Sequence, residues 1–303
     1  MVKSGSSYGI MLRAASALCF SLSFGLMKWG ATLEPVAASE MVFYRALFGL
    51  PVVLLWIVGQ KTGLDAIKTK RPLVHLWRCA LGVSGIFLIF EGIKHLALAD
   101  ATTIGFTAPI FATLLSILFL KEKVGLHRWV AILIGFIGVM VVVRPGAAGA
   151  PPLVGLLFAL CGAFVAASVT VTLRQLGKTE SATSIVFWFF IACAVAGGTV
   201  ALFNGHPHTL AVMAILAAGG LTGGFAQMLM TNSLRHAPVS TLAPLDYLQM
   251  VGAVLLGWML MSDVPTTATL AGASLIAASG LYTAWRERVR HREITPPSAN
   301  ASV

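Results

Sequence analysis

Ten long apolar segments follow one another along the chain and are separated by short polar connections. Most are about 20 residues long, the length at which an α-helix crosses the hydrocarbon core of a bilayer. The connections are too short to hold a soluble domain, so the pattern predicts an all-α integral membrane protein with ten transmembrane helices in one bundle. The predicted helices cover residues 10–31, 36–58, 73–91, 100–120, 126–143, 153–174, 182–203, 209–232, 238–261 and 266–285.

The composition excludes most soluble classes of protein. Of the 303 residues, 57% are hydrophobic and 11% are charged, against roughly 45–50% and 25% in soluble domains. A net charge of +10 would suit a nucleic-acid partner, but the charges fall in short clusters between apolar segments, so we expect no nucleic acid. The four cysteines lie inside apolar segments without the paired spacing of a metal site.

Lysine and arginine are concentrated on every second connection, and cytoplasmic loops carry such an excess of positive charge. One set of connections and helix ends holds Lys3, Arg13, Lys61, Lys68, Lys70, Arg71, Arg78, Lys121, Lys123, Arg128, Arg174, Lys178, Arg235, Arg286, Arg288, Arg290 and Arg292. The opposite set holds Lys28, Lys94 and Arg144. We therefore expect a multi-pass protein of the cell inner (plasma) membrane with both termini cytoplasmic. A cleavable signal peptide over the first segment is the alternative, but that segment has a counterpart in the second half.

The two halves of the chain resemble each other. The motif Ala-Leu-Cys at 17–19 recurs at 159–161, and a basic residue followed by histidine at 94–95 recurs at 235–236. Because each half has five spans, the second half enters the membrane in the opposite direction, which is the construction of many secondary transporters. Duplication kept only for packing is the alternative. The predicted units are a first five-helix repeat over 10–143, a linker over 144–152, a second five-helix repeat over 153–285, and a basic, disordered cytoplasmic tail over 286–303.

Several motifs then carry a family resemblance. They are Glu-Met-Val-Phe-Tyr-Arg at 40–45, Thr-Ala-Pro at 107–109, Leu-Lys-Glu-Lys at 120–123, Leu-Ala-Pro-Leu-Asp-Tyr at 242–247 and Met-Ser-Asp at 261–263. With its two five-span halves, the chain resembles the drug/metabolite transporter superfamily and, more narrowly, its EamA-type proteins. The resemblance implies transport of a small molecule without indicating which one. The seventh span departs from it, since residues 185–188 include no acidic or basic residue to match those of the second span.

Two charges lie deep inside predicted spans, where an ionisable group is costly and usually faces a cavity or a partner. Arg45 lies about 14 Å from one end of the second span, and Asp246 about 12 Å from the opposite face in the ninth. We predict that both face one cavity, where Arg45 binds a carboxylate and Asp246 an ammonium group or a proton. A direct Arg45–Asp246 ion pair that locks the halves together is the alternative. The remaining charges at span ends, Arg13, Lys28, Arg78 and Glu91, are expected to reach the interface.

Polar and aromatic residues near these charges complete the predicted substrate site. They are Glu40, Tyr44, Tyr247, Trp188, Gln227 and Gln249. Glu40 has an alternative role at a helix start, and the aromatic residues have one as interfacial anchors. The predicted helix breaks or hinges are Pro109, Pro244, Gly220 and Gly224, with close helix packing as the alternative for the glycines. Glu122 and Asp263, which end equivalent spans, are expected to have structural roles.

The motifs of metalloproteases, phosphate-binding loops and serine hydrolases are missing from the sequence, so no catalytic residue, metal or cofactor is predicted. The sequence thus predicts a secondary transporter that moves a small polar or zwitterionic, amino-acid-like metabolite by alternating access. A receptor or assembly subunit is the main alternative, and an intramembrane enzyme a weaker one. The expected partners are the substrate and the bilayer, with a proton or counter-substrate and a homodimer left open.

Overall fold

The computed structural model describes residues 3–59, 63–120, 126–147, 149–177, 179–237 and 239–294. Over these residues the chain is helical almost throughout and forms no strand, as predicted. The helices are α1 (Lys3–Leu33), α2 (Ala38–Gly59), η1 (Gly63–Ile67), α3 (Pro72–His95), α4 (Leu98–Gly105), α5 (Ala108–Leu120), α6 (Leu126–Val143), α7 (Leu153–Leu176), α8 (Ala182–Asn204), α9 (Leu210–Ser233), α10 (Val239–Leu242), η2 (Ala243–Asp246), α11 (Tyr247–Met261) and α12 (Thr267–Ile294).

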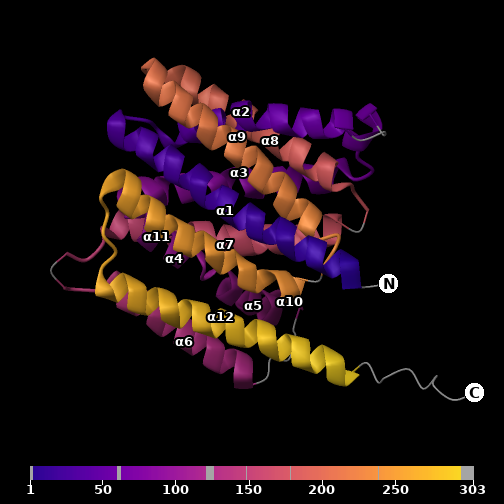
Figure 1. The fold of residues 1–303 in the computed structure, drawn as a ribbon, viewed down its shortest axis with the longest axis vertical. Helices are drawn as coiled ribbons and strands as arrows, with labels where there is room; N and C mark the ends of the chain where they lie inside the picture. The colour runs from indigo at the N-terminus through magenta and orange to yellow at the C-terminus, as the bar shows by residue number, and fades with distance from the viewer. Residues whose placement is uncertain are drawn as a thin grey trace, which may run out of the picture.

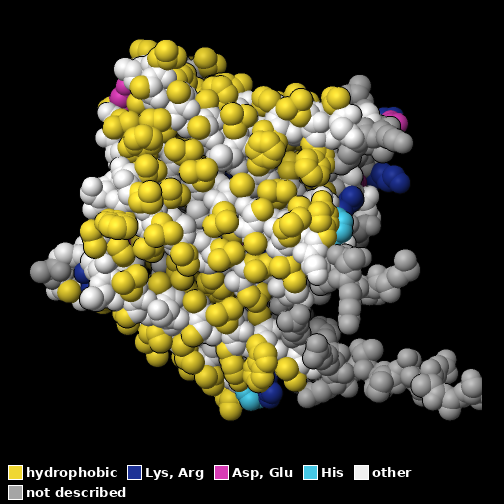
Figure 2. Space-filling model, in the orientation of Figure 1, with side chains coloured by type: hydrophobic (Ala, Val, Ile, Leu, Met, Phe, Trp, Pro, Cys, Tyr) yellow, Lys and Arg dark blue, Asp and Glu magenta, His cyan; other side chains and the backbone are white. Residues whose placement is uncertain are grey.

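Eight stretches of these helices are long and apolar enough to cross a membrane, and α6 contributes a shorter apolar segment. The ten predicted spans correspond to the observed helices, with two of them divided: α4 and α5 form the fourth, and α10, η2 and α11 form the ninth. Figure 2 shows hydrophobic side chains over most of the visible face, with the charged groups at its edges. Such a large exposed apolar surface is covered by lipid in a multi-pass membrane protein.

The packing of the helices follows an inverted repeat. Helix α1 packs along α9, and its counterpart in the second half, α7, packs in the same way along α3. Helix α2 packs against its own counterpart α8, and α6 against α12, which lie side by side in Figure 1. Each of these contacts joins a helix of the first half to a helix of the second, and equivalent helices make equivalent contacts. This pattern is expected of two halves related by a pseudo-two-fold axis.

Both divided spans break at equivalent positions of the two halves. Helices α4 and α10 begin 141 residues apart, and so do α6 and α12. At the same offset, Phe106 after α4 stacks on Tyr247 at the start of α11, with ring centroids 5.0 Å apart and ring planes at 29°. Contact between two equivalent residues places this pair at the pseudo-two-fold axis. Pro109 lies in the first turn of α5 and Pro244 in η2, next to these breaks.

The glycines of α9 pack closely against α2. A Cβ atom at Gly220 would lie 2.7 Å from the Tyr44 carbonyl oxygen, and one at Gly224 would lie 2.7 Å from the Gly49 carbonyl oxygen. These distances require glycine at both positions, because a methyl group would collide with backbone atoms of the neighbouring helix. Since α9 is continuous through both glycines, their contacts are those of close packing, and a hinge at either remains a prediction.

Helix α1 begins and α12 ends at the same end of the bundle, which we call the proximal end; the opposite end is the distal end (Figure 1). Lys68 follows η1 at the proximal end, before α3, and Lys94 lies near the distal end of α3. We expect a membrane-impermeant maleimide to label Lys94→Cys but not Lys68→Cys in intact cells, with the four native cysteines replaced. Strong labelling of Lys68→Cys with none of Lys94→Cys would contradict cytoplasmic termini.

Candidate functional site

Arg45 lies in the interior of the bundle without a polar partner. Its side chain on α2 is 3% exposed, and among the described residues it forms no ion pair and its Nε has no hydrogen-bond acceptor. The guanidinium carbon instead lies 5.6–6.0 Å from the ring centroids of Phe20, Phe24 and Phe190. Aromatic faces return about 0.5–2 kcal/mol to a guanidinium. A buried donor without an acceptor costs about 1–3 kcal/mol, which is as large as or larger than that return.

Arg78 on α3 lies in a similar environment, although its position near a span end predicted a side chain that reaches the interface. It is only 2% exposed, and its Nε and Nη1 have no acceptor in the part of the chain that the structure describes. Its guanidinium carbon lies 4.8 Å from the Phe189 ring centroid. The expectation of an interfacial Arg78 is therefore wrong. Distance from a helix end does not give the direction of a side chain, and on α3 this one faces α8.

Asp246 forms an ion pair with Arg13, not with Arg45. The Arg13 Nε donates to Oδ1 at 2.5 Å and its Nη2 donates to Oδ2 at 2.6 Å, which is the paired geometry of a guanidinium on a carboxylate. The pair joins α1 of the first half to η2 of the second, and its side chains are 15% and 30% exposed. The direct Arg45–Asp246 ion pair left open by the sequence is thus not formed in this structure.

Glu40 organises the distal end of the bundle. Its carboxylate accepts hydrogen bonds from the backbone nitrogens of Ala37 and His206, at 2.8 and 3.0 Å, and lies 3.2 Å from Nε2 of His208. These contacts tie the start of α2 to the connection between α8 and α9, in agreement with the helix-start role. They occupy both carboxylate oxygens of Glu40, so a substrate contact would require this end to open.

Other distal contacts surround this cluster. The His208 Nδ1 lies 3.1 Å from Glu34, whose carboxyl pKa is lowered chiefly by the hydrogen bond from the Thr209 hydroxyl. Asp263 lies 3.6 Å from the Lys28 ammonium, beside the end of α11, where a structural role was expected. Glu122, its predicted counterpart, lies outside the described residues.

The remaining predicted site residues are dispersed. The Tyr44 ring lies 6.1 Å from the His208 ring at the distal end, whereas the Trp188 Nε1 donates to the Ile67 carbonyl oxygen at the proximal end. Gln227 is buried on α9, and the backbone oxygen of Gln249 accepts a hydrogen bond from the Ser21 hydroxyl. The structure therefore places Trp188 of α8 away from the distal cluster, at the opposite end of the bundle from Tyr44.

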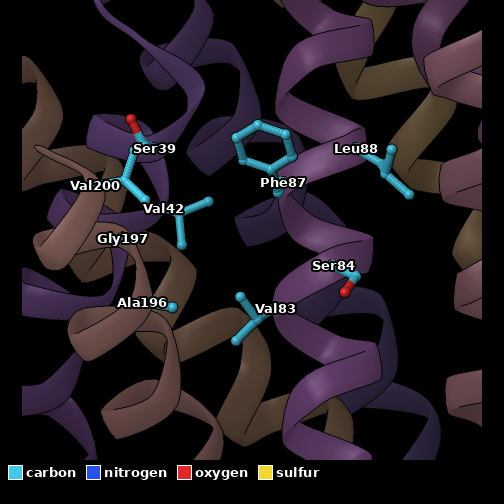
Figure 3. A pocket seen from close by; sticks show the side chains of 9 residues that line it. All are labelled: Ser39, Val42, Val83, Ser84, Phe87, Leu88, Ala196, Gly197 and Val200. Carbon is cyan, nitrogen blue, oxygen red and sulfur yellow. The ribbon is translucent and has the colours of Figure 1, made fainter. Parts of the chain in front are cut away.

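A pocket of about 330 Å³ opens between α2, α3 and α8. In Figure 3, Val83 and Phe87 of α3 lie across the pocket from Val42 of α2. It is lined by Ser39, Val42, Val83, Ser84, Phe87, Leu88, Ala196, Gly197 and Val200. Because this lining is almost entirely apolar and holds no predicted site residue, the pocket itself offers nothing that would recognise a charged ligand.

Known proteins that are similar to this chain agree with an architecture of two repeats. The EamA-like transporter family matches the chain twice, over residues 7–144 and 153–284. The pseudopaline exporter CntI of Pseudomonas aeruginosa is 28% identical over 273 residues, covering 89% of this chain and 94% of the relative. An S-adenosylmethionine uptake transporter of Rickettsia bellii is 27% identical, covering 82% and 84%. A riboflavin transporter of Rhizobium johnstonii is 28% identical, covering 94% and 93%.

One solved crystal structure has the same fold, with a TM-score of 0.67 at 17% identity. The match covers 94% of this chain and 99% of that one. At this identity the similarity concerns the fold alone.

Proposed function

The chain belongs to the EamA-like transporter family, and on that premise we propose that it moves a small zwitterionic, amino-acid-like metabolite across the membrane by alternating access. The named relatives transport small metabolites, and the names include both an exporter and an uptake transporter. The proposal concerns the class of substrate and the residues that bind it, and leaves direction open. We propose no chemical conversion, and place the protein in the cell inner membrane with cytoplasmic termini.

The observation that carries the proposal is the unpaired Arg45 in the interior of the bundle. An arginine stays charged when buried, and its planar fork of donors matches a carboxylate. A purely structural arginine at this depth would be expected to have a carboxylate partner, because an unpaired buried charge is costly. A substrate carboxylate that enters the site would supply the missing acceptor and offset the cost of burying the charge.

Asp246 supports the second half of the proposal. Its partner Arg13 holds it in the closed pair, next to the break between η2 and α11 and to the Phe106–Tyr247 stack. A substrate ammonium that displaces Arg13 from Asp246 would separate α1 from η2 and thereby release a contact between the two halves. Substrate binding and movement of the halves would then be one event, as alternating access requires. A proton on Asp246 would weaken the same pair, which is the form that proton coupling would take.

Transport into proteoliposomes that contain the purified protein tests the function. With an outward gradient of unlabelled amino acids inside, we expect exchange uptake of at least one labelled zwitterionic amino acid, several-fold above that of empty liposomes. Amines without a carboxylate and carboxylic acids without an amine should compete weakly, because each leaves one of the two charges bare. Uptake of none of the amino acids, or competition by uncharged compounds as strong as that by amino acids, would contradict the proposed substrate class.

A further inference from the structure

We propose that Arg45 and Arg78 form one anion-binding site, and that the substrate carries two carboxylates, one for each guanidinium. This inference rests on the proposed function and narrows its substrate to a small amino dicarboxylate. Nothing in the sequence pattern groups the two arginines, since they lie on different helices and Arg78 has the position of an interfacial residue.

The two guanidinium groups share one aromatic pair on α8. Arg45 lies 5.6 Å from the centroid of the Phe190 ring and Arg78 lies 4.8 Å from that of Phe189. These two rings are consecutive in sequence and contact each other edge to face, with centroids 5.7 Å apart. The two arginines, from α2 and α3, are thus linked through adjacent aromatic rings of α8.

The charge in this region is uncompensated. Neither arginine has a carboxylate within ion-pair distance among the described residues, and Nε of both and Nη1 of Arg78 have no hydrogen-bond acceptor there. Arg13 shows what a paired arginine looks like in the same bundle, because both oxygens of Asp246 accept its hydrogen bonds. An anionic ligand with two acceptor groups is the partner that would satisfy both arginines at once.

Glycines make room for both side chains. A Cβ atom at Gly82 would lie 2.2 Å from Nη1 of Arg78, and one at Gly223 would lie 3.0 Å from Nε of Arg45. The same three helices are incompletely packed further along, where the pocket of Figure 3 has Val42 and Val83 in its lining. Val42 lies three residues from Arg45, about one turn of helix, and Val83 lies five residues from Arg78, about one and a half turns. Separation of α3 from α2 along this pocket would expose the arginines to a ligand.

Calorimetric titration of the purified full-length protein tests the two-carboxylate site. The probes are L-aspartate, L-glutamate and L-2-aminoadipate, which span three separations of the carboxylates, with L-asparagine and L-glutamine as amides that lack the second one. We expect at least one acid to bind the wild type roughly tenfold or more tightly than the amide it is compared with. L-aspartate is compared with L-asparagine, and L-glutamate and L-2-aminoadipate are compared with L-glutamine. Arg78→Gln should abolish that preference and bind acids as weakly as amides, whereas Lys68→Gln, a loss of charge at the exposed proximal end, should keep it.

The melting temperature separates a binding role from a structural one. Arg78→Gln removes an unpaired buried charge and should melt no lower than the wild type, and Gly82→Ala, which pushes the guanidinium aside, should lose the same preference with the charge retained. If acids and amides bind equally, if neither binds, or if both variants keep the preference, the inference is wrong. If the preference is found but no probe is transported into proteoliposomes, the binding site stands and the proposed transport function fails.

Discussion

Arg45→Gln is expected to reduce transport at least 100-fold while leaving the protein folded. Each hydrogen bond between a guanidinium and a carboxylate contributes about 1.5–3 kcal/mol. Loss of two such bonds corresponds to a factor of about 100 or more at 1.4 kcal/mol for each tenfold change. The wild-type structure gives the arginine no carboxylate to lose among the described residues, so the replacement strands no partner. We expect the melting temperature of Arg45→Gln to equal or exceed that of the wild type.

Uptake into proteoliposomes and the melting temperature should be measured on the same preparations of Arg45→Gln. Arg45→Lys is the matched control, because lysine keeps the charge but offers no planar fork, so an intermediate rate is expected. A fall of the melting temperature by several degrees, with transport per folded molecule unchanged, would show that Arg45 stabilises the bundle through its aromatic contacts and has no substrate to bind.

The fold could be predicted from the sequence because it depends on two features that the sequence shows directly, the length of the apolar segments and the repeat between the halves. The length of each apolar segment predicts a spanning helix, and the offset between the halves predicts their opposite orientation. The breaks in the fourth and ninth spans were expected near Pro109 and Pro244, since proline lacks the donor that would continue the helix. The contact between Phe106 and Tyr247 was not expected, because a stack across the pseudo-two-fold axis depends on how the halves dock.

The candidate site could be predicted only in part. The depth of Arg45 in its span correctly indicated a buried charge. Arg13 and Arg78 lie closer to span ends, and the count of residues from an end could not distinguish a side chain that reaches the interface from one that turns into the bundle. The direction depends on which neighbour each helix face meets: η2 for Arg13 and α8 for Arg78. Pairing between residues more than 200 positions apart is likewise invisible to a periodicity argument.

The Arg13–Asp246 pair makes the second large prediction, since stability and transport should respond to it differently. Asp246→Asn strands the guanidinium of Arg13, and truncating one partner of a fully buried pair costs about 3–5 kcal/mol. The two side chains here are 15% and 30% exposed, and water screens part of that cost. We therefore expect Asp246→Asn to lower the melting temperature by several degrees, and Arg13→Gln to do so by less, because the more exposed carboxylate remains hydrated.

The double variant Arg13→Gln/Asp246→Asn then separates a lock from a substrate site. Without either charge no group is stranded, so the melting temperature should return most of the way to that of the wild type. Transport should be lost in Asp246→Asn and should stay lost in the double variant, because both lack the carboxylate that would receive the substrate's ammonium group. A stable double variant with wild-type transport would mean that the pair only fastens α1 to η2, and that Asp246 takes no part in binding. Arg13→Gln alone should fold and bind substrate, since it frees Asp246 without removing it, and it should transport more slowly only if reclosure of this pair limits the cycle.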